Sequence, residues 1–112
     1  MTPLWTITPE KIKEAVRKIV AFEQPKRVIL FGSAVRGTAH PHSDVDILVV
    51  TKKEVASPRH ESVRIRRALR GLVMPMEILV ISEERLRELA DRPGLIYREA
   101  LRNGKVVYEA AA

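Results

Sequence analysis

The spacing of apolar residues near the N-terminus is helical. Thr8 and Pro9 suit the N-cap and the first position of a helix. The apolar positions that follow at helical spacing are Ile12, Ala15, Val16, Ile19 and Val20. We therefore predict an amphipathic helix that begins at Pro9 and ends no later than Pro25.

Short apolar runs predict the strands. Residues 27–31 are apolar past the first residue, and residues 44–50 are apolar past their aspartates. A run without a polar face is typical of a strand that is buried under helices. A third strand is predicted over residues 76–81, and a short edge strand over residues 106–108.

Capping residues predict the remaining helices. Ser57 and Pro58 repeat the cap-and-proline start, and we predict a helix that runs to about Arg70, with Gly71 just past its end. Ser82 caps a helix that opens with two glutamates, and a last short helix covers residues 95–101. This order predicts an α/β sandwich that forms a single domain over residues 1–112.

Two aspartates open the second predicted strand. Asp44 and Asp46 are two positions apart, and such side chains project from the same face of a strand. Carboxylates held side by side repel each other, and burying them unpaired is costly. A bridging cation relieves both penalties, and Mg²⁺ takes oxygen ligands. The pattern therefore indicates a metal site.

The segment between these two strands has the features of a phosphate-binding turn. Gly32 and Ser33 follow a buried strand, where backbone N–H groups can bind phosphate; an ordinary strand-to-helix turn is the alternative. Gly37 completes the glycine spacing of a P-loop, but Thr38 stands where that motif needs lysine, which excludes it. Arg36 could neutralise a phosphate or simply face the solvent.

Two histidines precede the aspartates at alternating positions. A strand that began at His40 would align His40 and His42 with both carboxylates and suit a transition metal. Pro41 and Ser43 favour a loop instead.

The combination of Gly32-Ser33, a polar loop, and Ser43-Asp44-Val45-Asp46 before Ile-Leu-Val-Val resembles the DNA polymerase beta-type nucleotidyltransferase superfamily. It is most similar to the minimal nucleotidyltransferase branch, whose members pair as antitoxins with HEPN-domain toxins. The resemblance covers most of the chain. It implies the nucleotidyltransferase fold, a small mixed sheet of three main strands plus a short edge strand, flanked by helices.

The resemblance also implies a third carboxylate. The family carries an acidic residue on the next core strand, often after a proline and an apolar residue, as in Pro75-Met76-Glu77. The family usually has aspartate there. The longer side chain of Glu77 leaves metal ligation possible but puts efficient general-base action in doubt. The alternative is an exposed residue at the start of a strand.

On this resemblance, the catalytic and metal-binding residues are Asp44, Asp46 and Glu77, and the nucleotide-binding residues are Gly32, Ser33 and Arg36. The implied reaction is Mg²⁺-dependent transfer of AMP from ATP to a hydroxyl, expected to be a tyrosine of a HEPN-domain partner, within a toxin–antitoxin hetero-oligomer. The alternative is a catalytically weak or inactive module that neutralises a HEPN ribonuclease by contact. An RNA-binding accessory protein is a third possibility.

Composition narrows the choice of partner and compartment. The chain has 20 Lys and Arg against 14 Asp and Glu, a net charge of +6 that favours an anionic partner such as a nucleotide, RNA or an acidic protein. Without cysteine there are no disulfides and no thiolate chemistry. No apolar run approaches the roughly 20 residues of a membrane span, and the N-terminus lacks a signal-peptide pattern. We therefore expect a cytoplasmic protein.

Four arginines fall on one side of the helix predicted over residues 57–70. They lie opposite its apolar side and are Arg59, Arg66, Arg67 and Arg70. This arginine stripe is either a solvated face or a contact surface for an acidic partner or nucleic acid.

Overall fold

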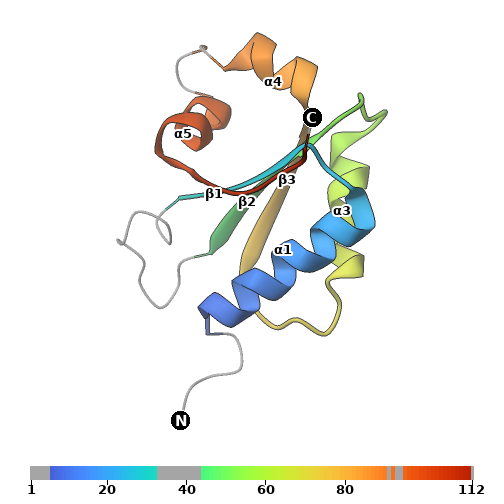
Figure 1. The fold of residues 1–112 in the computed structure, drawn as a ribbon, viewed down its shortest axis with the longest axis vertical. Coiled ribbons are helices and arrows are strands. Elements are labelled where there is room, and N and C mark those ends of the chain that lie inside the picture. The colour runs from blue at the N-terminus through green and yellow to red at the C-terminus, as the bar shows by residue number, and fades with distance from the viewer. Residues whose placement is uncertain (1–5, 33–43, 91, 93–94, 112) are drawn as a thin grey trace.

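The computed structural model describes residues 6–32, 44–90, 92 and 95–111. Its four strands form one mixed sheet in the order β3-β2-β1-β4 (Figure 1). The strands are β1 (Arg27–Phe31), β2 (Val45–Thr51), β3 (Met76–Ser82) and β4 (Lys105–Glu109). β1 is antiparallel to both of its neighbours, whereas β2 and β3 are parallel.

Helices cover both faces of the sheet. α1 (Pro9–Glu23) and α3 (Pro58–Ala68) lie on one face, and α4 (Glu83–Leu89) and α5 (Ile96–Asn103) lie on the other (Figure 1). The predicted fold, a small mixed sheet of three main strands and a short edge strand flanked by helices, is confirmed. None of the described helices is long and apolar enough to cross a membrane.

The helix starts follow the capping residues. The Thr8 hydroxyl accepts a hydrogen bond from the Lys11 backbone N–H at 3.1 Å, and Pro9 takes the first helical position. Ser57 and Ser82 cap α3 and α4 in the same way. Local side-chain chemistry therefore sets where these three helices begin.

Several boundaries differ from the prediction. α3 ends at Ala68, before the predicted Arg70, because Leu69 leaves the helical conformation and a turn follows. α5 continues to Asn103, and β4 extends one residue beyond the predicted edge strand at each end. Helix ends commonly fray through tighter turns, which sequence spacing does not resolve.

Two apolar clusters hold the helices on the sheet. Alternate residues of β2 point to opposite faces. Val45, Ile47 and Val49 join the cluster under α1 and α3. Leu48 and Val50 join the cluster under α4 and α5. Asp46, near the start of β2, points to the same face as Leu48, under α4 and α5.

Candidate active site

Two carboxylates lie side by side at the start of the parallel strand pair. Asp46 of β2 is directly opposite Glu77 of β3 in the register of the sheet. Asp46 lies two residues before Leu48, and Glu77 lies two residues before Leu79, so both point to the face covered by α4 and α5. The sheet pairing therefore brings together residues that are 31 positions apart in the sequence (77 minus 46).

The third acidic residue lies just outside the sheet. Asp44 is exposed and precedes β2, Asp46 is half-buried, and Glu77 is exposed. Burial raises the pKa of Asp46, and the nearby charges of Glu77 and then Asp44 raise it further. The three carboxylates are therefore close enough for the charges of Glu77 and Asp44 to act on Asp46.

A glycine brings the end of β1 against the same carboxylate. Asp46 is also paired with Phe31, the last residue of β1, and Gly32 follows with φ +87°. A Cβ atom added to Gly32 would overlap Asp46 Oδ2. Both the backbone conformation and the space at this position require glycine. The turn that was predicted to bind phosphate thus begins directly beside Asp46.

The rest of the predicted phosphate-binding segment lies outside the described residues. Ser33, Arg36, His40 and His42 all belong to it, so their predicted roles stay predictions.

The carboxylates suit Mg²⁺ only with help from a substrate. Within residues 6–32, 44–90, 92 and 95–111, no group of three or more His, Asp or Glu side chains could hold a metal ion by itself. Mg²⁺ is commonly bound by one or two carboxylates together with substrate phosphates and water. Asp46 and Glu77, with Asp44 near them, provide that kind of incomplete oxygen donor set. The residues therefore fit Mg²⁺ that arrives with a phosphate-bearing substrate.

Residues 9–107 match the family described as "Nucleotidyltransferase domain", and the chain belongs to this family. No curated protein sequence matches it significantly.

The solved structures that are similar to this chain include three that bear on its class. A protein described as a minimal nucleotidyltransferase shares 31% identity over 86% of this chain and 89% of its own, with a TM-score of 0.56. A toxin–antitoxin structure with AMP-PNP shares 20% identity over 88% and 73% of the two chains, with a TM-score of 0.57. Spectinomycin adenyltransferase from Enterococcus faecialis, solved with ATP and spectinomycin, shares 20% identity over 95% of this chain and 58% of its own, with a TM-score of 0.62. The latter two support the fold.

One feature near the site was not predicted from the sequence. Arg66 of α3 donates a hydrogen bond to the backbone oxygen of Met76, the residue before Glu77, at 3.3 Å. The helical spacing correctly placed Arg66 on an exposed face. It could not show that β3 would be the outer strand next to that face, because strand order depends on pairing between distant segments.

Proposed function

We propose that this protein is a Mg²⁺-dependent nucleotidyltransferase that transfers AMP from ATP to a hydroxyl group of a partner protein. The observation that carries the proposal is the Asp46–Glu77 pair, held on neighbouring strands beside the Gly32 turn. Membership of the nucleotidyltransferase family supports the reaction class. The similar structures solved with AMP-PNP and with ATP support an adenine nucleotide as the donor.

The carboxylates and the turn would have separate roles. Asp44, Asp46 and Glu77 would hold Mg²⁺, which would neutralise charge on the triphosphate. The backbone N–H groups of Gly32 and Ser33 would orient the β- and γ-phosphates. Arg36 would add a positive charge to the same phosphates.

Bond changes would occur at the α-phosphorus of ATP. The acceptor hydroxyl oxygen would form a bond to that phosphorus, and the bond from the phosphorus to the bridging oxygen would break, so that pyrophosphate leaves. Glu77 would accept the hydroxyl proton, because it is exposed beside Asp46 and is able to meet an incoming acceptor. Most of the rate enhancement would come from positioning and charge neutralisation.

The partner we propose is a HEPN-domain toxin that is modified on a tyrosine. The resemblance to minimal nucleotidyltransferases and the likeness to a toxin–antitoxin structure support this partner. The protein would then act as the antitoxin of a cytoplasmic hetero-oligomer. Its net charge of +6 suits an acidic protein surface as well as a nucleotide.

A second candidate function is neutralisation of a HEPN ribonuclease by contact alone. Two observations favour it: glutamate stands at position 77, where the resembling family usually has aspartate, and the exposed arginines of the arginine stripe offer a contact surface for an acidic partner. In that case ATP transfer would be weak or absent.

Transfer of label from ATP separates these two functions. The protein is incubated with ATP labelled at the α-phosphate, Mg²⁺ and a HEPN-domain protein, and label on the partner is measured. We expect the wild type to label the partner, Glu77→Gln to lose most of that transfer, and Glu109→Gln, which changes an exposed glutamate on β4, to retain it. Unlabelled partner that is nevertheless inhibited would favour neutralisation by contact.

A further inference from the structure

The outer edge of β3 carries backbone groups that pair with no described strand. β3 is the last strand of the described sheet and pairs only with β2. The Val45 backbone N–H donates to the Pro75 oxygen at 3.0 Å. In a parallel ladder, successive residues direct their backbone groups alternately toward and away from the neighbouring strand. The outward-facing N–H and C=O groups are therefore those of Met76, Ile78 and Val80. The hydrogen bond from Arg66 to the Met76 oxygen agrees with this assignment.

This edge has fewer of the features that protect the opposite edge of the sheet. β3 is seven residues long, keeps a regular register with β2, and contains neither lysine nor proline. β4 has five residues, begins with Lys105 and ends with Glu109, and its register with β1 shifts between Val28 and Ile29. Short length, charged residues and irregular register are the usual protections against pairing with another strand. Of the two edges, β3 is the one suited to accept a further strand.

A groove of about 350 Å³ follows the outer edge of β3 between the two helical layers. Residues of α3 form one wall, Tyr97 of α5 lies on the other side, and β3 contributes the residues between them. The lining residues that matter here are Arg59, Ser62, Arg66, Glu77, Leu79 and Tyr97. The groove therefore reaches Glu77 of the candidate active site.

The α3 wall of the groove is positively charged. Arg59 and Arg66 are exposed, and neither forms an ion pair with a described carboxylate. Among the described ion pairs, the one on α3 joins Arg64 to Glu61, away from the groove. An occupant with acidic side chains on this side would neutralise both arginines.

We propose that an extended acidic segment of the acceptor protein adds to the outer edge of β3 and so brings its hydroxyl group to Glu77. This inference rests on the proposed function. Main-chain hydrogen bonds to the edge would supply affinity, and alternate side chains would supply specificity. Side chains of the added strand point alternately toward Arg59 and Arg66 and toward Glu77 and Tyr97. The acceptor residue therefore lies between two acidic neighbours in its own sequence.

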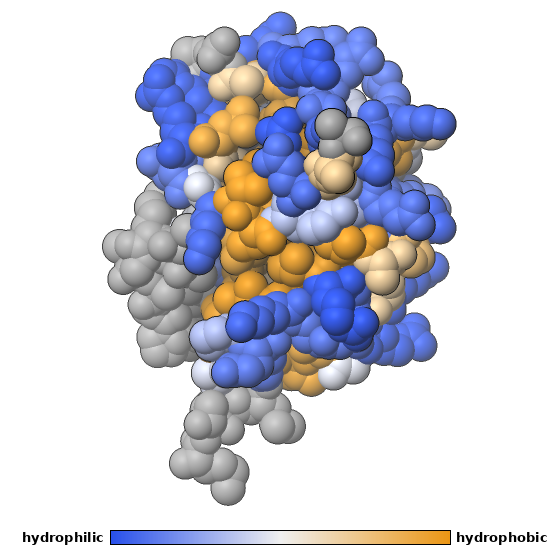
Figure 2. Space-filling model, viewed as in Figure 1, coloured by the Kyte–Doolittle hydropathy of each residue, from blue (hydrophilic) through white to orange (hydrophobic). Residues whose placement is uncertain are grey.

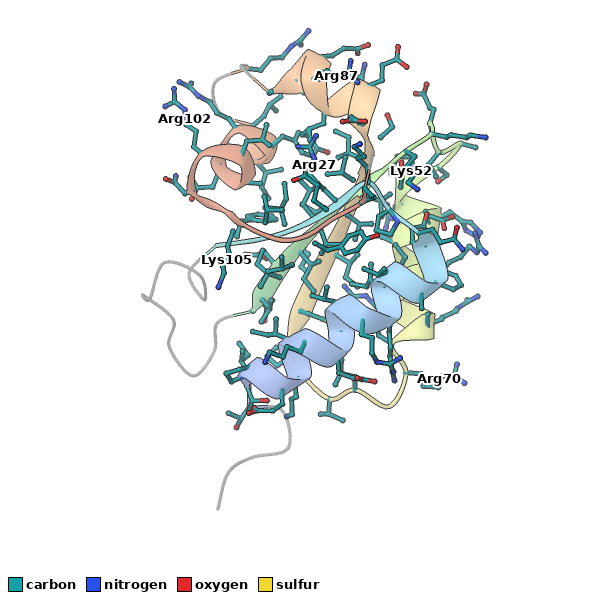
Figure 3. The ribbon with its side chains drawn as sticks, viewed as in Figure 1. Arg27, Lys52, Arg70, Arg87, Arg102 and Lys105 are labelled. Atoms are coloured by element: carbon teal, nitrogen blue, oxygen red, sulfur yellow. The ribbon has the colours of Figure 1, made fainter. Side chains whose placement is uncertain are left out.

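A synthetic peptide tests the charge requirement. The probe is fluorescein-labelled Glu-Val-Glu-Tyr-Glu-Val-Glu, and its binding to the full chain is followed by fluorescence anisotropy. We expect Arg59→Gln with Arg66→Gln to weaken binding by about tenfold or more, because both charges line the groove. Arg67→Gln with Arg70→Gln removes the same charge nearby but outside the groove lining, and should change affinity by less than about twofold. Figure 3 shows Arg70 pointing away from the ribbon.

Three results would overturn the charge requirement. They are equal weakening by both double variants, no effect of either, and no binding to the wild type. Thermal melts of each variant confirm that the fold is retained, so that loss of binding reports on the groove.

Backbone methylation of the same peptide tests strand addition. Methyl groups on alternate backbone nitrogens block hydrogen bonds along one edge of the peptide only. We expect one methylated set to weaken binding by about tenfold and the other set to bind normally, because only one peptide edge faces β3. Equal affinities of the two sets would contradict strand addition. Self-association of the protein that excludes the peptide would show that a second copy occupies the edge, and would also overturn the proposal.

Failure of this inference differs from failure of the proposed function. If ATP labels the HEPN partner but Arg59→Gln with Arg66→Gln leaves labelling unchanged, the edge is not the docking surface and the enzyme function stands. If the peptide binds as described but ATP labels no partner, the docking edge stands and the enzyme function fails. ATP affinity, measured alongside, should be the same in both double variants.

Discussion

The charge of Asp46 lowers the stability of the folded protein, because the pairing of β2 with β3 places it opposite Glu77. It is half-buried opposite Glu77, and its pKa is raised by burial and by the charges of Glu77 and Asp44. Because the folded-state pKa lies above the ordinary value of 3.8, this group lowers stability as the pH rises through that interval. The cost therefore grows as the pH rises, unless a cation offsets it.

Asp46→Asn should stabilise the metal-free protein. The amide keeps nearly the same volume and removes the repulsion, so we expect a gain of about 1 kcal/mol after solvent screening. In a domain of this size that is roughly 4–8 °C in melting temperature. Thermal melts in EDTA at pH 7 measure the change, with Glu109→Gln as a control for loss of one exposed charge. A variant that melts below the wild type would mean that the Asp46 carboxylate makes stabilising contacts.

Gly32→Ala should destabilise the protein through backbone strain and through overlap with Asp46. Gly71→Ala should show the backbone strain alone. Gly32 has φ +87° and an added Cβ would overlap Asp46, whereas Gly71 has φ +95° and open space around the added atom. Gly71→Ala should therefore cost about 1 kcal/mol of backbone strain, and Gly32→Ala about 2 kcal/mol or more. Urea unfolding measures both. Equal costs would show that Asp46 moves aside without penalty.

The sequence allowed the candidate site residues to be identified, but it did not show which side chains lie next to them. The sequence predicted a turn that begins at Gly32, and in the structure this glycine has a positive φ. The group that approaches Gly32 is the Asp46 carboxylate, which results from the pairing of β1 with β2. Local sequence does not encode which side chain a paired strand brings to a turn.

Two glutamates join α1 to α3. Burial raises the pKa of Glu23, at the end of α1, to about 7, and the hydrogen bond and charge of Glu61 add to this. Glu61 is buried on α3 and accepts hydrogen bonds from Arg64 at 2.9 and 3.1 Å. The hydrogen bond to Glu23 and the adjacent Arg64 lower the pKa of Glu61. Below about pH 7, Glu23 therefore holds the proton that lies between the two carboxyl groups.

Glu23→Gln should remove a pH-dependent loss of stability. The folded-state pKa of about 7 exceeds the ordinary value of 4.5, so the folded protein binds more protons in this interval and the free energy of unfolding falls as the pH rises through it. We expect the melting temperature of the wild type to fall between about pH 5 and pH 7, and that of Glu23→Gln to fall less. Glu84→Gln, an exposed change on α4, is the control. Identical pH slopes in all three proteins would contradict the shared proton.

Helix starts were predictable from the sequence, whereas contacts between helices were not. Thr8, Ser57 and Ser82 cap helices through local hydrogen bonds, so their positions followed from the sequence. Glu61 lies one helical turn before the apolar Ile65, and this spacing indicates that Glu61 faces the buried side of α3. Nothing nearby in the sequence indicated that Glu23 would be its partner.

At the scale of the molecule, two grooves lined by described residues differ in charge. The β3 groove has the arginine wall, whereas a second groove between α1 and β4 is mainly apolar. The side chains of the second groove include Ile12, Val16, Val20, Val107 and Tyr108. Apolar surface is visible in the middle of the view in Figure 2. The two surfaces would respond differently to salt, because screening weakens contacts between exposed charges.

Salt dependence therefore reports which surface a partner uses. Affinity for the proposed acidic acceptor should fall at least about tenfold between low and high ionic strength, because Arg59 and Arg66 are exposed. The matched Arg59→Gln, Arg66→Gln protein should show a smaller change. Partner affinity that does not depend on salt would place the contact on an uncharged surface instead.

The class of fold was predictable at this scale, but the strand order was not. The alternation of helical and strand periods predicted an α/β sheet, and the resemblance implied its mixed character; both are confirmed. The last strand of the chain, β4, pairs with β1, which leaves β3 at the outer edge. This order depends on contacts between segments far apart in the sequence, and it decides where the groove beside Glu77 lies.

Calorimetric binding of ATP with Mg²⁺ and with EDTA, in the wild type and in Asp46→Asn, tests most directly whether this carboxylate site holds a metal-bound nucleotide. We predict that the wild type binds ATP with Mg²⁺ and loses that binding in EDTA, because triphosphate and bare carboxylates repel each other. Asp46→Asn should lose most of the Mg²⁺-dependent affinity while remaining folded. Equal ATP affinity of the wild type in Mg²⁺ and in EDTA, unchanged in Asp46→Asn, would contradict the proposed site.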